Sequence, residues 1–555
     1  MKRSIVICVV VLLTAAPVAW ANTPLIEAVK QQDRATVRTL LEQGVDVNAT
    51  DGDGSTALHW AAANGDVELT HALLKAGATV KAVTRIGGMS ALFMSARHGN
   101  ERVVDALLNA GADAREANAN GTTVLMMAAA SGNPAAVQLL IDRGADVNAT
   151  DVTNGQTALM FAAARNAHAT IKLLLERGAK PGVTTKVVKL ERPRVDAEGN
   201  PLPPPTAADA PSPEQPANPP QAGGQQTQQR RRGVLGATVM GGMTALHFAA
   251  REGHIDAARA LVAGGADVNL VTGSDQTSPI VEAIINGHMD VAKMLLEAGA
   301  DPRQANMDGL TPLYAAVDMR WRHNSWYPQP TIEEEKTDYL ELMTMLLDRG
   351  ADVNAQLKRK LWFRKFRYGD DWVDPNGATP FWRAAQANDI AAMRLLAARG
   401  ADPNIATARD VTPLMVAAGV GFEYQGTNIS PDSRAAAVTY LVEELRADVN
   451  AKDDLHYTTL HGAAYVGDND VIVYLVSKGA DMTARAKGRL AGTQDAEEVP
   501  LGTGDTVADM ANGPREKSLL HPATVALAEK LGSENSHDCR STACVNNTKA
   551  EKPKQ

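Results

Sequence analysis

One short motif returns along this chain about every 33 residues. The apolar residue of a T-x-L start falls at Leu25, Leu58, Leu92, Leu125 and Leu159, with steps of 33, 34, 33 and 34. It returns at Leu246, Ile280, Leu313, Phe381, Leu414, Leu460 and, in degraded form, Ala508. A sustained period of this length is typical of a solenoid, in which each unit stacks only on its neighbours.

The residues of each period predict two short helices. A Thr stands where an N-cap is needed, as at Thr244 and Thr311, and Pro often follows where its missing N–H costs nothing. An Ala-rich helix comes next and ends at Gly, and a second helix with VxxLL spacing also ends at Gly; the glycines are Gly65, Gly132, Gly253 and Gly287, then Gly77, Gly144, Gly265 and Gly350. Both helices are shorter than the roughly 12–15 residues at which an isolated helix becomes marginal, so each unit must be buried by its neighbours.

The motif itself resembles the ankyrin repeat. G-x-T-A-L-H-x-A-A occurs at Gly54–Ala62 and Gly242–Ala250, and GADVNA occurs at Gly144–Ala149 and Gly350–Ala355. The resemblance covers most of residues 23–533. It implies an all-α fold, an ankyrin-repeat solenoid of about twelve helix–turn–helix units with hairpin-like loops along one edge. It also implies a role in binding other proteins and no reaction.

The first 21 residues have the pattern of a secretory signal peptide. Lys2 and Arg3 precede an apolar run, and Ala19-Trp20-Ala21 forms a small-x-small cleavage signal. We therefore expect an exported protein, periplasmic or secreted and bacterial, with no membrane span after cleavage; an uncleaved anchor is the alternative. Loss of two cations makes the mature chain more acidic than the −9 of the whole sequence, which argues against nucleic acid as a partner.

Breaks in the period divide the chain. We predict a signal peptide at 1–21, repeats 1–5 at 22–189, a disordered Pro/Gln-rich linker at 190–240, repeats 6–12 at 241–533 and a polar tail at 534–555. The linker lengthens a hairpin loop, as do extra residues after Gly350 and Gly479. Other extra residues separate the two helices of the units that begin at Leu313 and Leu414, and Arg446 replaces the helix-ending Gly of the second of these.

Aromatic residues gather in the two inserts around the eighth unit and the start of the ninth. Five of the seven tryptophans lie there, although aromatic residues make up only 4% of the chain. Because Trp, Tyr and Arg dominate binding hot spots, we expect either a partner site or a satellite core formed by the two inserts. Base stacking is a third, weaker reading. The candidate residues are Trp321, Trp326, Tyr327, Trp362, Phe363, Phe366, Tyr368, Trp372 and Trp382.

No arrangement of residues predicts catalysis or a cofactor. The chain contains no GxSxG, HExxH, Walker or dinucleotide-binding motif, so we expect a protein that is not an enzyme. His59, His247 and His461 occupy one slot of the repeat, where a ring nitrogen is expected to bridge neighbouring turns. Cys539 and Cys544 are expected to form one small disulfide; a metal site with His537 and Asp538 is the weaker alternative, because the spacing matches no standard site.

These features together predict an exported, non-enzymatic scaffold that binds an unidentified protein. Two other functions stay open. One is a secreted effector that acts on a host cell. The other is a glycan-binding or glycan-processing protein that uses the clustered tryptophans, although Asp370 and Asp371 are adjacent and make a poor pair of opposed carboxylates.

Limited proteolysis tests the division of the chain. We expect a nonspecific protease to cut first between residues 190 and 240, because Pro-rich sequence without apolar periodicity cannot offset its ordering entropy by burial. Fragments near 22–190 and 240–533 should accumulate on a gel and be identified by mass. Faster cutting inside either block of repeats would contradict the division.

Overall fold

The computed structural model describes residues 23–189, 239–322, 332–361, 373–422, 428–490, 497–498, 504–514, 518–536 and 539–541. The chain divides into two compact units, Met1–Lys180 (unit 1) and Pro181–Gln555 (unit 2). Within the described residues no helix combines the length and the apolar character that a membrane crossing needs.

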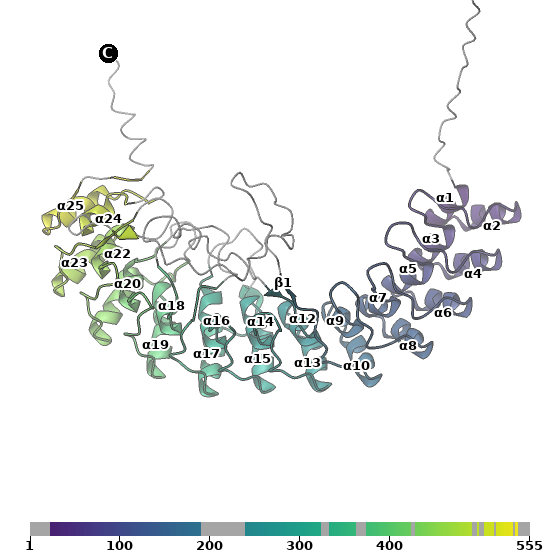
Figure 1. Cartoon of the computed structure of the whole chain (residues 1–555), viewed down its shortest axis with the longest axis horizontal. Helices are drawn as coiled ribbons and strands as arrows, with labels where there is room; N and C mark the ends of the chain where they lie inside the picture. The colour runs from purple at the N-terminus through teal and green to yellow at the C-terminus, as the bar shows by residue number, and fades with distance from the viewer. Residues whose placement is uncertain are drawn as a thin grey trace, which may run out of the picture. The chain divides into compact units, whose positions relative to one another are not determined.

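Unit 1 is a stack of five helix pairs. The first helices lie side by side, and the second helices form a layer next to them (Figure 1). The pairs are α1 (Pro24–Lys30) with α2 (Arg34–Glu42), α3 (Ala57–Asn64) with α4 (Val67–Lys75), α5 (Ala91–Arg97) with α6 (Glu101–Asn109), α7 (Val124–Ser131) with α8 (Pro134–Asp142), and α9 (Ala158–Ala163) with α10 (His168–Glu176).

Unit 2 contains seven further pairs in its described residues, so the prediction of about twelve units is confirmed. They are α12 (Ala245–Arg251) with α13 (Ile255–Ala263), α14 (Pro279–Ile285) with α15 (Met289–Glu297), α16 (Pro312–Arg320) with α17 (Tyr339–Asp348), α18 (Pro380–Gln386) with α19 (Ile390–Ala398), α20 (Pro413–Ala418) with α21 (Arg434–Thr439), α22 (Thr459–Val466) with α23 (Asn469–Ser477), and α24 (Val507–Ala511) with α25 (Pro522–Lys530). A 3₁₀ turn η2 (Ile332–Glu334) and a π-helical turn η4 (Tyr440–Glu444) complete the helical elements.

The helices begin at the predicted N-caps and bury the predicted apolar residues. Thr244 and Thr311 are N-caps whose hydroxyl oxygens accept from the backbone N–H groups of His247 and Tyr314. Pro occupies the first turn of α1, α14, α16, α18 and α20. The apolar residue of every T-x-L start is at most 3% exposed. The repeating sequence therefore supplies both the helix boundaries and the core.

A buried side chain joins each of several repeats to the next. In His247 the ring Nδ1 accepts from the backbone N–H of Thr244 (3.2 Å), and Nε2 lies 3.1 Å from the carbonyl oxygen of Thr277 in the following repeat. His59 and His461 make the equivalent bonds to Met89 and Asp505, which confirms the predicted bridge. Because Nδ1 accepts, Nε2 carries the proton and the neutral ring fits the site.

Repeats also meet along the tips of their hairpin loops. The backbone N–H of Arg85 donates to the carbonyl of Asp53 in the preceding repeat (2.8 Å). In unit 2 the same contact recurs, for example from Met307 to Asp275 (2.9 Å) and from Lys358 to Asp308 (2.8 Å). These bonds hold neighbouring hairpin loops at a constant spacing. A loop that contains extra residues therefore keeps the same contact with the preceding loop.

The predicted linker begins and ends in such a loop. β1 (Val188–Lys189) pairs antiparallel with β2 (Val239–Met240), and the N–H of Thr185 donates to the carbonyl of Met243 (2.9 Å). The described residues on both sides of the predicted linker therefore pair with each other in a hairpin loop. The linker prediction was wrong for its last two residues, since strand pairing orders Val239 and Met240; residues 190–238 lie outside the described residues. A second small sheet, β3 (Gly488–Arg489) with β4 (Glu497–Glu498), widens another hairpin loop.

The tenth repeat absorbs an extra residue inside its second helix. The N–H of Ala447 donates to the carbonyl of Leu441 (3.0 Å), six residues back, whereas Ala351 in the eighth repeat reaches five residues back to Leu346. The π-helical turn η4 takes up the difference, so Leu441 stays fully buried. Arg446 then adopts the positive φ (60°) that Gly provides elsewhere, as its place in the sequence predicts.

The histidine bridges predict a loss of stability in acid. Burial lowers the pKa of both His247 and His461 to about 4. Because these values lie below the unfolded value of 6.5, the stabilisation is complete above pH 6.5 and is lost as the pH falls toward 4, by about 3 kcal/mol for each histidine. Urea unfolding of unit 2, followed by tryptophan fluorescence at several pH values, measures this loss. The double variant His247→Gln/His461→Gln should lose less stability over the same interval; an unchanged pH dependence would contradict the assignment.

Candidate functional site

Two of the predicted aromatic site residues belong to the core. Trp382 is 1% exposed, and its indole N–H donates to the carbonyl of Val411 in the next repeat (2.9 Å). It stands in the repeat slot that His59, His247 and His461 occupy and makes their bridge. Trp321 is 7% exposed at the C-terminal end of α16. The partner-site prediction is therefore wrong for Trp321 and Trp382, since buried rings offer no surface to a partner.

Seven further aromatic residues were predicted for the site. Trp326, Tyr327, Trp362, Phe363, Phe366, Tyr368 and Trp372 lie outside the described residues. Their role stays a prediction.

Trp321 is held by a buried carboxylate. Asp389 accepts the indole N–H of Trp321 (2.7 Å) and the hydroxyl of Tyr339 (2.8 Å) on one oxygen, while its other oxygen caps α19 through the N–H of Ala392 (2.9 Å). The guanidinium of Arg320 lies 4.6 Å from the Trp321 ring centre. Burial, followed by the charge of Asp389, raises the pKa of Tyr339 well above its usual value, so the phenol remains a hydrogen-bond donor.

Two inserts meet over the short turn between α18 and α19. The side chain of Asn428 donates to the carbonyl of Arg322 (2.6 Å), and the N–H of Ser430 donates to the carbonyl of Ala387 (2.7 Å). Beneath them Arg383 forms a buried ion pair with Asp318 (2.9 Å). These contacts belong to the inter-helix inserts of repeats 8 and 10, so the described residues show a packed polar cluster here. The expected pairing of the two aromatic inserts with each other stays a prediction.

An open apolar row lies elsewhere, on the first helices of unit 1. In each of α3, α5, α7 and α9 the first six residues are buried except the fourth, which is half-buried. That residue comes two positions after the apolar residue of the T-x-L start, so the same face of each helix presents it. The four residues, called the inner row below, are Trp60, Met94, Met127 and Phe161.

The corresponding position is closed in most of unit 2. Phe248 is 7% exposed and Glu282 is half-buried, and from repeat 8 onward Ala315, Arg383 and Val416 are at most 3% exposed. Arg383 is covered in part by the backbone of Trp321, whose carbonyl accepts from its guanidinium. This position of the repeat is therefore accessible in repeats 2–5 of unit 1 and buried from repeat 8 onward in unit 2.

The surroundings of the inner row combine an apolar centre with charged borders. Trp60 is oriented by a bond from its indole N–H to Asp51 (3.3 Å), and the Lys30 ammonium lies 4.7 Å from its ring centre. Arg97 and Arg165 are exposed at the ends of α5 and α9. The hairpin loops of unit 1 also expose large apolar side chains, namely Val83 (53%), Ile86 (70%) and Val152 (63%). Apolar groups with polar flanks are the composition of a protein-binding surface.

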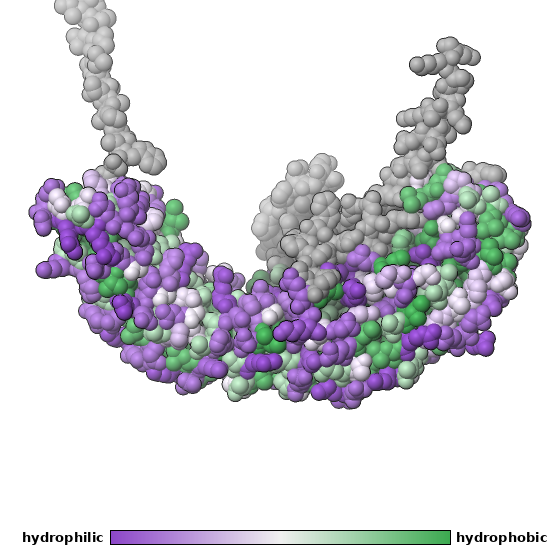
Figure 2. Space-filling view, turned by 180° about the vertical axis from the view of Figure 1, so that it is seen from behind, coloured by the Kyte–Doolittle hydropathy of each residue, from purple (hydrophilic) through white to green (hydrophobic). Residues whose placement is uncertain are grey.

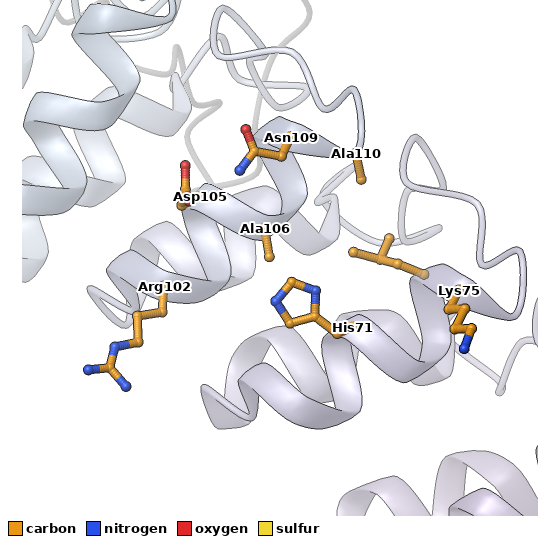
Figure 3. A pocket seen from close by; sticks show the side chains of 8 residues that line it. His71, Lys75, Arg102, Asp105, Ala106, Asn109 and Ala110 are labelled. Atoms are coloured by element: carbon orange, nitrogen blue, oxygen red, sulfur yellow. The ribbon is translucent and has the colours of Figure 1, made fainter.

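The second-helix side of unit 1 carries an open groove between α4 and α6. Its volume is about 370 Å3, and Figure 3 shows the ring of His71 on α4 directed toward Ala106 on α6. Asp105 and Asn109 at its edge already accept from Arg143 (3.3 and 2.7 Å). Small side chains at Ala106 and Ala110 account for the groove.

In Figure 2 hydrophobic and hydrophilic residues are interspersed along the visible face.

The remaining chemical candidates give no metal site in the described part of the chain. No group of three or more His, Cys, Asp or Glu side chains there has the geometry of a metal site. Cys539 is disulfide-bonded, whereas Cys544, its expected partner, lies outside the described residues.

Comparison with known proteins identifies the repeats. Models of ankyrin repeats in three copies match residues 72–151, 92–185, 228–306 and 246–357, a model of many copies matches 25–74, and a single-repeat model matches 376–408. Alpha-latrocrustotoxin-Lt1a of Latrodectus tredecimguttatus is 30% identical over 151 residues, which are 27% of this chain and 9% of the toxin.

Two further relatives match shorter stretches. Ankyrin repeat and SAM domain-containing protein 6 of Rattus norvegicus is 36% identical over 85 residues (15% of this chain, 8% of that protein). Palmitoyltransferase akr1 of Schizosaccharomyces pombe is 46% identical over 57 residues (10% and 9%). The chain spans less than a tenth of the length of each of these three relatives.

The inner row was not predicted from the sequence, although the sequence contains its signal. Aligning the repeats on the T-x-L start shows Trp, Met, Met and Phe in one column, at 60, 94, 127 and 161. A column of large apolar residues inside an Ala-rich helix indicates either core or a shared surface. Only the burial of the neighbouring positions identifies it as a surface.

Loss of the helix cap at Asp389 should destabilise unit 2 more than loss of an exposed helix cap. Asp389→Ala should lower the unfolding free energy of unit 2 by about 3 kcal/mol, because it removes an N-cap and leaves the buried indole N–H of Trp321 and the half-buried hydroxyl of Tyr339 without their acceptor. Asp338 is the matched control, since it caps α17 through the N–H of Leu340 (2.9 Å) at an exposed site. Asp338→Ala should cost about 1 kcal/mol by the same urea titration. Equal losses would mean that Trp321 and Tyr339 do not depend on Asp389.

Proposed function

We propose, because the chain belongs to the ankyrin-repeat family, that it is a non-enzymatic scaffold that binds a protein partner through the inner row of unit 1. Ankyrin repeats generally serve as protein-interaction modules. The observation that carries the choice of surface is the burial contrast: Trp60, Met94, Met127 and Phe161 are accessible, whereas the matching positions from repeat 8 onward are covered.

The chemistry of the row defines the partner. Four large apolar side chains on consecutive helices favour an apolar segment that runs across the repeats. Arg97 at the end of α5 and Arg165 just past the end of α9 are exposed, and they favour acidic groups along that side of the segment. The row sits on helices fixed by their neighbours, so binding needs little ordering of the scaffold. The pattern of residues 1–21 supports an exported scaffold, so we look for the partner in the cell envelope.

The two other candidate functions gain no support. The glycan hypothesis needs exposed tryptophan platforms, and Trp321 and Trp382 are buried. No described feature favours a host-cell effector over an envelope scaffold.

Site-specific photocrosslinking tests the proposed surface. A photoreactive amino acid at Met127 should form a crosslink to a discrete protein in intact cells, and mass spectrometry identifies that protein. The control position is Ala135, which is exposed on the second helix α8 of the same repeat. Crosslinking to the same proteins from both positions, or to none from Met127, would refute the proposal.

A double substitution then measures the contribution of the row. Trp60→Ala/Phe161→Ala should weaken binding of the crosslinked partner about a thousandfold, since each truncated hot-spot aromatic commonly costs at least about 2 kcal/mol of binding free energy. Calorimetry measures the affinity, and a thermal melt checks that unit 1 stays folded. Unchanged affinity in a folded variant would exclude the inner row.

A further inference from the structure

The last repeat inverts the bond that joins the other repeats. Asp509 stands three residues after Thr506, in the slot of His461, and accepts from the backbone N–H of Thr506 (3.0 Å) as the histidine does. On its far side His461 donates to the carbonyl of the next repeat, whereas Asp509 accepts from the N–H (2.8 Å) and the hydroxyl (2.6 Å) of Ser536. A donor toward the following repeat has become an acceptor.

The segment that meets Asp509 begins at the last residue of the predicted repeats and continues into the predicted polar tail. Residues 533–536 and 539–541 are called the strap below. The hydroxyl oxygen of Ser533 accepts from the N–H of Ala508 (3.1 Å), and the hydroxyl of Thr506 donates to the carbonyl of Glu534 (2.6 Å). The strap therefore lies at the start of α24, where the first helix of an internal repeat meets the next repeat. A thirteenth repeat would present a carbonyl here, and it would face the carboxylate of Asp509.

An ion pair with a buried carboxylate holds the other end of the strap. Arg540 pairs with Asp505, which is 2% exposed and also accepts from the hydroxyl of Tyr457 (3.0 Å) and the N–H of Leu490 (2.8 Å). The N–H of Arg540 donates to the carbonyl of Gly513 (2.9 Å). Ser541 is 1% exposed, and its hydroxyl donates to the carbonyl of Ser518 (2.6 Å).

Space at Gly513 also fits the strap. Gly513 has φ +71°, and a Cβ there would lie 2.8 Å from Cβ of Ser541 and 3.0 Å from Sγ of Cys539. Only glycine allows this close approach. The last repeat and the strap are therefore shaped for each other.

We propose that the strap closes the C-terminal end of the stack by taking the place of a further repeat, and that the ion pair between Arg540 and the buried Asp505 locks it there. The first part of the strap satisfies Asp509, and the second part neutralises Asp505. The two parts act as one cooperative element, so breaking the ion pair also loosens the contacts of Ser533 and Ser536.

Hydrogen exchange on the full chain tests the lock. Arg540→Gln leaves Asp505 buried without its cation, so the amides of Ala508 and Ser536 should exchange at least about tenfold faster. The amide of Ala508 donates to the hydroxyl of Ser533, and the amide of Ser536 donates to Asp509, so neither bond involves Arg540. The amides of residues 23–180 provide the internal reference. Arg485→Gln is the matched control, because Arg485 also pairs with the strap, at Glu534, but in an exposed position (2.6 Å). It should change the rates less than about twofold.

A charge-neutral double variant separates the ion pair from simple packing. Arg540→Gln/Asp505→Asn removes both charges of the pair and should recover most of the protection lost in either single variant. Unchanged exchange in Arg540→Gln, or a double variant no better protected than the singles, would overturn the lock. A loss confined to the amides of residues 539–541 would overturn the cooperative strap.

Discussion

Everything in this structure depends on contact between neighbouring repeats. The helices are five to ten residues long, too short to be stable alone, and their Ala-rich faces are buried only by the next pair. The bond from the ring of His247 to the carbonyl of Thr277 shows how specific that contact is. Each bridging histidine forms a hydrogen bond with the N-cap of its own helix on one side and with the backbone of the following repeat on the other.

Unit 2 shows what insertions do to such a framework. In the sequence, the extra residues fall in hairpin loops, between paired helices and, in the tenth repeat, inside the second helix. Between the helices, Asn428 and Ser430 contact the backbone of Arg322 and Ala387, and the backbone of Trp321 covers part of Arg383 on the inner face of repeat 9. Unit 1 has no comparable insert between its helices, so its inner row remains accessible. Insertion accounts for the cover over Arg383 in repeat 9, whereas Phe248 of repeat 6 is buried with no insert between its helices.

The fold could be predicted almost completely because its information is local and repeated. Caps, prolines and helix-ending glycines recur at fixed spacing, and even Arg446 was identifiable as a glycine substitute. The aromatic site was not predictable in the same way. The partner of Trp321 is Asp389, 68 residues away, and no local pattern links them. Trp382 was misassigned for a different reason: its neighbours in sequence are aromatic, but its slot in the repeat is that of a bridging histidine.

The bonds between repeats give the stack a direction. Side chains such as His59 donate toward the C-terminal neighbour, while loop amides such as that of Arg85 donate toward the N-terminal one. A whole repeat can therefore be duplicated inside the array, since every copy offers and requires the same groups. The C-terminal end follows a different rule, because Asp509 accepts where an internal histidine would donate. An array of this kind can lengthen in evolution from its interior, and a repeat added beyond Asp509 would first need that residue to change.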